Sequence, residues 1–179
     1  KNSLLQDIGL REKNMEYCIS ASIEPDLKKK VDNLRYHYDR NLMREKYPYI
    51  NILGPIESYS NLKKISSELT RFFKNRKRIR IGTDIMGFLE SDRVIFLNVS
   101  SDKGSLRNYH DLLLNEFSIE EPPLFFPHIS IAKNHTLEEL QTIYEELSGF
   151  TFQYSFFIES VSIFTKTDKY WEEYVALTI

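Results

Sequence analysis

One short segment of this chain combines a titratable side chain and a hydroxyl at a spacing that suits chemistry. It is the run Phe-Pro-His-Ile-Ser-Ile-Ala-Lys at 126–133. In a β-strand successive side chains point to opposite faces, so His128 and Ser130 would stand together while Ile129 and Ile131 face the core. An imidazole can move a proton, and a neighbouring hydroxyl can hold a phosphoryl oxygen. The plainer interpretation is a half-buried strand whose outer face happens to carry both residues.

A second segment has the same alternation of polar and apolar residues after a proline. Residues 47–55 are Tyr-Pro-Tyr-Ile-Asn-Ile-Leu-Gly-Pro, and alternation places Tyr49 and Asn51 on one face. Tyrosine, with a pKa of roughly 10, is a poor base near neutral pH, but it can donate a hydrogen bond. The NH₂ group of asparagine can hold a phosphate oxygen. Either segment alone is a weak signal, whereas two such segments in one chain are a specific signal.

Cationic and aromatic residues could extend such a site. Lys133 follows the first segment and could neutralise a phosphate, or it could be a solvated lysine at a strand end. Arg76 and Arg78 belong to the dense basic run at 74–80, which could follow a nucleic-acid backbone or form a solvated helix end. Four aromatic side chains could stack on a base or pack in the core: Phe125, Phe126, Tyr170 and Trp171.

Three other histidines could serve as a partner for His128, or could be surface or structural residues. They are His37, His110 and His135. His37 is the best placed of them, because its predicted helix leads towards the segment with Tyr49. The sequence has no clustered spacing of metal ligands, so we expect neither a metal site nor a cofactor.

Alternating apolar patterns predict the elements that position these residues. Helices are predicted from 25 to 38, from 62 to 73, from 105 to 113 and from 136 to 148. Strands are predicted over 16–23, 49–53, 78–88, 94–99, 127–132, 150–165 and 171–179, and the second of these is expected to stop at Gly54-Pro55.

The order of these elements indicates two similar halves. Each half has a helix, a short strand with a candidate motif, another helix and then two strands. We therefore predict an α+β fold with two lobes and an internal pseudo-twofold axis. Residues 1–15 are predicted to be an N-terminal extension, and residues 16–179 a single domain.

Composition limits the class of protein. The chain has 179 residues, 41% of them hydrophobic, and a net charge of -2, so any contact with a polyanion must come from a local patch. Its single cysteine, Cys18, excludes an internal disulfide and favours a reducing, cytoplasmic location. No stretch has the length of a membrane span. The sequence does not begin with Met, and we expect it to be a piece of a longer protein.

The paired motifs resemble the 2H phosphoesterase superfamily, in which each of two halves carries a His-x-Thr/Ser motif on a central strand. The resemblance extends from about residue 16 to the C-terminus. The closing strand with Trp171 is also similar to the last strand of the family. The proline before the family's first motif and the Gly-Pro turn after it are present here as Pro48, Gly54 and Pro55. The second motif is matched by His128 and Ser130 after Pro127.

The resemblance implies antiparallel sheets around a central groove, with helices outside. The family includes 2'-5' RNA ligase-like proteins, 2',3'-cyclic nucleotide phosphodiesterases, enzymes that degrade 2'-5' oligoadenylate and nucleotide binders without catalysis. It also implies a metal-independent mechanism, in which one imidazole takes a proton from the attacking hydroxyl or water and the other protonates the leaving oxygen. Here Tyr49 and Asn51 stand where the first histidine and the first Thr/Ser would be.

Three hypotheses follow. The first is a domain that binds a nucleotide or RNA phosphate, with two-histidine catalysis weakened or lost because a positioned acid or base contributes roughly 10²- to 10⁴-fold. The second is an active phosphodiesterase on 2',3'-cyclic phosphates or 2'-5' linkages that uses His128 with Tyr49 or another partner. The third is a protein-interaction module that keeps only the fold.

Overall fold

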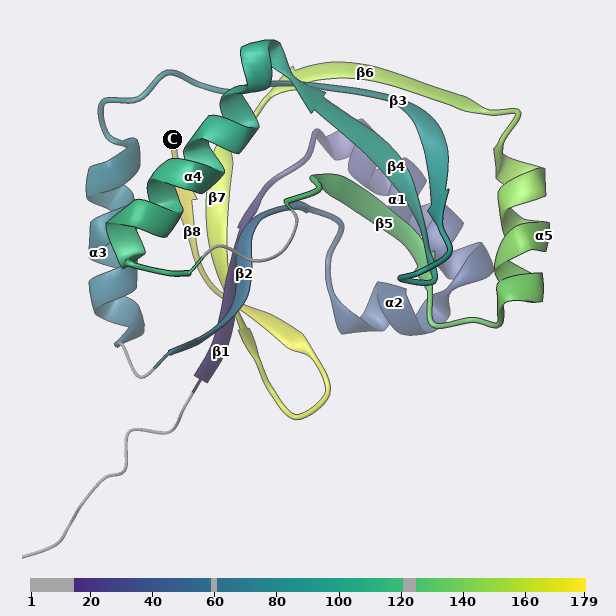
Figure 1. Cartoon of the computed structure of the whole chain (residues 1–179), viewed down its shortest axis with the longest axis horizontal. Coiled ribbons are helices and arrows are strands. Elements are labelled where there is room, and N and C mark those ends of the chain that lie inside the picture. The colour runs from purple at the N-terminus through teal and green to yellow at the C-terminus, as the bar shows by residue number, and fades with distance from the viewer. Residues whose placement is uncertain (1–14, 59–60, 121–124) are drawn as a thin grey trace, which may run out of the picture.

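Two four-stranded antiparallel sheets form the centre of the molecule (Figure 1), in a computed structural model that describes residues 15–58, 61–120 and 125–179. The first sheet has the order β2 (Ile50–Ser58), β1 (Met15–Ala21), β7 (Ser160–Lys166) and β8 (Trp171–Thr178). The second has the order β5 (His128–Lys133), β4 (Val94–Ser101), β3 (Arg80–Leu89) and β6 (Thr151–Phe157). The prediction of a two-lobed α+β fold is confirmed.

Helices cover the outer sides of the two sheets (Figure 1). They are α1 (Pro25–Tyr38), α2 (Arg40–Glu45), α3 (Leu62–Phe73), α4 (Ser105–Phe117), which a short 3-10 turn at Asp102–Gly104 precedes, and α5 (Leu137–Leu147). Two helices pack across the lobes. α1 follows β1 of the first sheet but contacts β5 of the second, and α4 follows β4 of the second sheet but contacts β2 of the first. The strands β2 and β5 also contact each other, so the two predicted motifs meet between the lobes.

Local sequence explains why α1 forms where it does. Pro25 suits the first turn of a helix, and the carboxylate of Glu24 caps it by accepting from the backbone N–H groups of Asp26 and Leu27 at 3.1 and 2.9 Å. One face then buries Leu27, Val31 and Arg35, which are spaced four residues apart. The third member of this buried stripe is a cation.

The predicted strand at 150–165 is wrong as a single element. The chain forms β6 in one sheet, crosses at Ile158 and Glu159, and continues as β7 in the other sheet. Backbone pairing fixes the crossing, because Ile158 N donates to Ile79 O and Ile179 N donates to Glu159 O, each at 3.0 Å. The apolar alternation changes phase at this point, from Phe156 and Ile158 to Val161 and Ile163, and this signal of a break was missed.

The prediction that the second strand stops at Gly54-Pro55 is also wrong. β2 continues to Ser58 as an edge strand, where a proline is tolerated, and the pairing with β1 shifts at this point. The peptide bond before Pro55 is cis, and Gly54 has a φ of 99°. A Cβ at Gly54 would lie 2.8 Å from Tyr17 O, so this close approach requires glycine.

Two further differences from the predicted elements concern the segment between α1 and β2 and the start of the chain. The short helix α2 between α1 and β2 was not predicted. The predicted extension at 1–15 lies outside the described residues except for Met15, which begins β1. In the described part of the chain no helix is long and apolar enough to cross a membrane.

Candidate phosphate-binding site

A pocket of about 260 Å³ lies between the two lobes, and we call it the central pocket. It contains all four residues of the predicted motifs and one predicted cation. Its lining residues are Arg35, Leu42, Glu45, Lys46, Tyr49, Asn51, Pro55, His128, Ser130, Lys133 and Trp171. Segments from α1, α2, β2, β5 and β8 thus meet around one small space.

The β5 motif presents its polar side chains to this pocket. Alternation holds as predicted, since Ile129 and Ile131 are fully buried on the opposite face. His128 Nδ1 donates to Phe126 O at 2.8 Å, which leaves the lone pair of Nε2 to accept from Ser130 Oγ at 3.1 Å. Burial lowers the pKa of His128 from its ordinary value, against an opposing effect of the Phe126 carbonyl. The imidazole is therefore a neutral proton acceptor near neutral pH.

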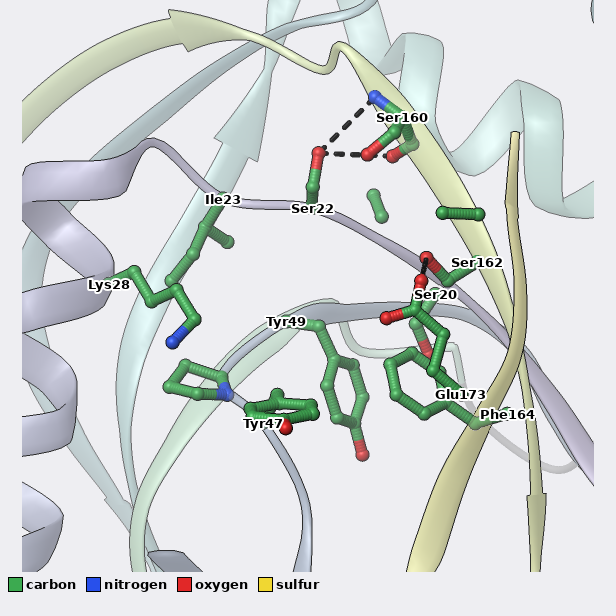
Figure 2. A pocket seen from close by; sticks show the side chains of 13 residues that line it. Ser20, Ser22, Ile23, Lys28, Tyr47, Tyr49, Ser160, Ser162, Phe164 and Glu173 are labelled. Atoms are coloured by element: carbon green, nitrogen blue, oxygen red, sulfur yellow. Dashed lines mark hydrogen bonds between the residues drawn. The ribbon is translucent and has the colours of Figure 1, made fainter. Parts of the chain in front are cut away.

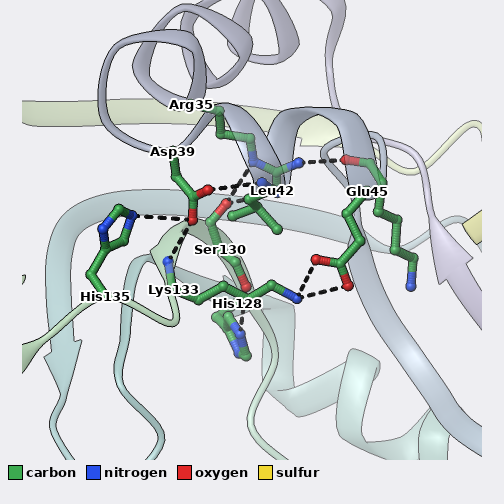
Figure 3. Close-up of polar contacts among 9 residues, drawn as sticks. Arg35, Asp39, Leu42, Glu45, His128, Ser130, Lys133 and His135 are labelled. Atoms are coloured by element: carbon green, nitrogen blue, oxygen red, sulfur yellow. Dashed lines mark hydrogen bonds and ion pairs between the residues drawn. The ribbon is translucent and has the colours of Figure 1, made fainter. Parts of the chain in front are cut away.

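A buried arginine holds the backbone behind this motif (Figure 3). Arg35 is 2% exposed, and its Nε and Nη2 atoms donate to Ser130 O at 2.9 and 2.7 Å. Its Nη1 atom donates to Lys46 O at 2.8 Å. Burial lowers the pKa of Arg35 to about 10, so the guanidinium stays charged at neutral pH. Arg35 thus fixes the positions of Ser130 and Lys46 relative to each other.

Two carboxylates hold the end of β5 (Figure 3). Asp39 caps α2 by accepting from Leu42 N at 2.8 Å, and its other oxygen accepts from Lys133 N at 2.9 Å. The Lys133 ammonium lies 3.0 Å from both oxygens of Glu45. Lys133 therefore lies in the pocket, but a phosphate would have to compete with Glu45 for it.

The β2 motif is packed more tightly. Tyr49 stacks on Phe164 with ring centroids 5.2 Å apart, and burial raises its pKa above the ordinary range. Asn51 Nδ2 donates to Gly54 O at 2.6 Å, and Asn51 Oδ1 accepts from Ser20 Oγ at 3.2 Å. The Tyr49 phenol thus stays protonated, and one amide N–H of Asn51 remains for a ligand.

Other predicted candidates lie outside the central pocket. Arg76 stacks over Phe72 at 3.9 Å, and Arg78 lines a different cavity. His37 is exposed beside Tyr38, and His110 is buried with Nδ1 2.7 Å from Ile52 O. The remaining histidine, His135, lies 3.6 Å from Asp39. Of the four aromatic residues proposed to stack on a base, Trp171 alone lines the pocket.

Sequence reasoning missed three polar residues of the pocket: Arg35, Glu45 and Lys46. A signal existed for Arg35, because it continues the four-residue spacing of Leu27 and Val31 on α1. No comparable pattern marks Glu45 or Lys46, which depend on the unpredicted α2.

A second pocket of about 310 Å³ lies on the other side of Tyr49 (Figure 2). Four serines line it together with Tyr47 and Phe164: Ser20, Ser22, Ser160 and Ser162. Three of the four hydroxyls, those of Ser20, Ser22 and Ser162, already have partners within the protein. Ser20 bonds to Asn51, Ser22 to Ser160 and Ser162 to Glu173. Its polar wall is therefore less available to a ligand than that of the central pocket.

Among residues 15–58, 61–120 and 125–179, no group of three or more His, Cys, Asp or Glu side chains could hold a metal ion. The polar groups of the central pocket are one imidazole, hydroxyls, an amide, two ammonium groups and a guanidinium, together with the single carboxylate of Glu45. Such a set suits an anion with several oxygen acceptors.

Comparisons with known proteins agree with this geometry. A family model described as the 2'-5' RNA ligase superfamily matches residues 23–169. The fold is similar to E. coli LigT complexed with NADP+ (TM-score 0.66) and with 3'-AMP (TM-score 0.65), each at 11% identity over 93% of this chain and 99% of LigT. It is also similar to TT0787 of Thermus thermophilus (TM-score 0.63, 13% identity, 92% and 97% covered). Among curated proteins, no sequence matches this chain.

Proposed function

Because the chain belongs to the 2'-5' RNA ligase superfamily, the family of 2H phosphoesterases, we propose that its central pocket binds the phosphate of a nucleotide or of an RNA end. The observation that carries the proposal is the meeting of His128, Ser130, Asn51 and Lys133 around one space of about 260 Å³. Ser130 and Asn51 offer hydrogen bonds to phosphate oxygens, and Lys133 offers charge. Structures of LigT with NADP+, 3'-AMP and ATP support a nucleotide ligand.

We expect two-histidine catalysis to be weakened or lost in this protein. The first motif has Tyr49 in place of histidine, and burial raises the pKa of its phenol, so Tyr49 does not act as a base near neutral pH. Asn51 replaces a hydroxyl with an amide that is already bonded to Gly54 and Ser20. The site keeps groups that bind phosphate but has a single imidazole.

Calorimetric titration of 3'-AMP and adenosine tests the binding function. We expect 3'-AMP to bind at least tenfold more tightly than adenosine, because the pocket recognises the phosphate. Lys133→Met should weaken 3'-AMP binding about tenfold, since it removes the cation and leaves Glu45 unpaired beside the ligand. Lys29→Met removes an exposed lysine of α1 and should change nothing. Equal affinity for 3'-AMP and adenosine, or no binding of either, would contradict the proposal.

A second candidate function is metal-independent hydrolysis of a 2',3'-cyclic phosphate or a 2'-5' linkage. The neutral His128 with an accepting Nε2 favours it, because this tautomer can take a proton from water. Turnover that disappears in His128→Ala would support it. Folded protein that neither binds nor turns over nucleotides would instead support a module for protein interaction.

A further inference from the structure

A buried lysine outside both motifs faces the central pocket. Lys46 follows α2 with an extended backbone (φ −163°, ψ 141°), and its side chain is 9% exposed. Arg35 holds its carbonyl, as described above, so the position of Lys46 relative to β5 is fixed. The residue lines the central pocket together with His128.

The ammonium of Lys46 lies among aromatic rings and a thiol. Its Nζ atom is 2.9 Å from Cys18 Sγ and 3.7, 4.4 and 5.3 Å from the ring centroids of Tyr49, Trp171 and Phe164. Within the described part of the chain it has no ion pair with a carboxylate, since Glu45 pairs with Lys133 instead. Burying a cation without a counterion costs stability, and the contacts with these aromatic rings offset that cost only in part.

Burial lowers the pKa of Lys46 to about 8. The charged and titratable groups around it act in both directions. Cys18 on β1 and Glu45 on α2 raise this pKa, while Lys133 on β5 lowers it. Lys46 is therefore an ammonium at neutral pH, but one that can release a proton far more easily than an exposed lysine.

Lys46 and His128 thus differ in protonation near neutral pH. Burial lowers the pKa of His128 from its ordinary value, with Phe126 O and Asp92 acting in the opposite direction. One group is a neutral acceptor and the other a charged donor. Environments that separate two titratable groups in this way are typical of a base and an acid.

We propose that Lys46 is the general acid of a phosphodiester hydrolysis in which His128 is the general base. This inference rests on the proposed binding of a nucleotide phosphate in the central pocket. Water attacks phosphorus, and Nε2 of His128 takes a proton from it as the new P–O bond forms. The bond from phosphorus to the leaving oxygen breaks, and that oxygen takes a proton from Nζ of Lys46. Solvent then removes the proton from the imidazolium and returns one to the amine.

The test measures hydrolysis of adenosine 2',3'-cyclic phosphate from pH 5 to 10, together with the affinity for 3'-AMP. We expect a bell-shaped profile whose upper limb falls near pH 8, because the acid must be protonated. Lys46→Arg keeps the positive charge but cannot release a proton. It should bind 3'-AMP within about threefold of wild type and lose about 10²-fold in kcat, with no fall of the residual rate near pH 8. Lys29→Arg on the exposed face of α1 is the matched control and should leave both unchanged.

Several outcomes would overturn the inference. One is a Lys46→Arg enzyme with kcat within threefold of wild type, and another is an upper limb that persists near pH 8 in that variant. Thermal unfolding shows whether Lys46→Arg folds. If it does not, kcat and the pH profile are measured on Lys46→Met instead. A wild-type profile without an upper limb near pH 8 also overturns the inference. Wild-type protein that binds 3'-AMP but hydrolyses no cyclic phosphate also overturns this inference, while the binding function stands. Absence of 3'-AMP binding overturns both.

Discussion

The two motif strands place similar polar pairs against one pocket but use them differently. On β5, the fold holds the backbone through Arg35 and leaves the side chains of His128 and Ser130 bonded only locally, facing the pocket. In the other motif the side chains themselves hold the fold, because Tyr49, directly before β2, stacks on Phe164, and Asn51 on β2 donates to Gly54 O. The difference is that the polar side chains of the β5 motif face the pocket without packing roles, while those of the other motif contribute to the packing around it.

The largest effect should come from removing the support of β5. Arg35→Met leaves Ser130 O and Lys46 O without their donors in a buried setting, and we expect it to lower the free energy of unfolding by about 3 kcal/mol. Urea unfolding measures this change. Arg40→Met, at an exposed arginine of α2, is the matched control and should stay within about 0.5 kcal/mol of wild type. Equal effects of the two substitutions would show that Arg35 does not support the motif.

Substitutions within the two motifs should have effects of intermediate size, on stability in one motif and on ligand binding in the other. Asn51→Ala removes bonds to Gly54 and Ser20 and should lower the free energy of unfolding by about 1–2 kcal/mol. Ser130→Ala should leave stability within about 0.5 kcal/mol but weaken 3'-AMP binding about fivefold, since its hydroxyl lines the pocket. Urea unfolding and calorimetry on both variants provide the comparison. The reverse pattern, with Ser130→Ala mainly destabilising, would contradict it.

The smallest effect should come from releasing a cation in the pocket. Glu45→Gln removes the partner of Lys133 and should strengthen 3'-AMP binding two- to fivefold at low salt, in keeping with the roughly 0–1 kcal/mol of a partly exposed pair. Calorimetry at two salt concentrations measures it, and the gain should shrink at high salt. Glu116→Gln breaks the Arg71–Glu116 pair far from this chemistry and should have no effect. Weaker binding by Glu45→Gln would mean that Glu45 itself contacts the ligand.

Strand alternation was enough to predict the two motifs. His128, Ser130, Tyr49 and Asn51 were identified from a period of two and flanking prolines, which are local properties of the chain. The pocket that joins them could be inferred only through a resemblance, since it needs β2 and β5 from opposite lobes.

The supporting residues could not be predicted in the same way. Arg35 and Lys46 are long cations that sequence patterns normally assign to the surface. Arg35 is buried because α1 packs against β5, a segment about 90 residues further along the chain. Lys46 is buried because β1, β7 and β8 bring Cys18, Phe164 and Trp171 around it. Between β6 and β7 a change of phase marks the break, but pairing with distant strands decides which sheet each part joins.

The position of β7 has a consequence for synthesis and truncation. β7 lies between β1 and β8, and it pairs with β1 across more than a hundred residues of chain. The first sheet therefore closes only after residues 160–166 have left the ribosome, although its first two strands are made early. Phe164 on β7 and Trp171 on β8 complete the aromatic enclosure of Lys46. A nascent chain that ends before Phe164 has both motifs but lacks the aromatic residues that enclose Lys46 in the central pocket.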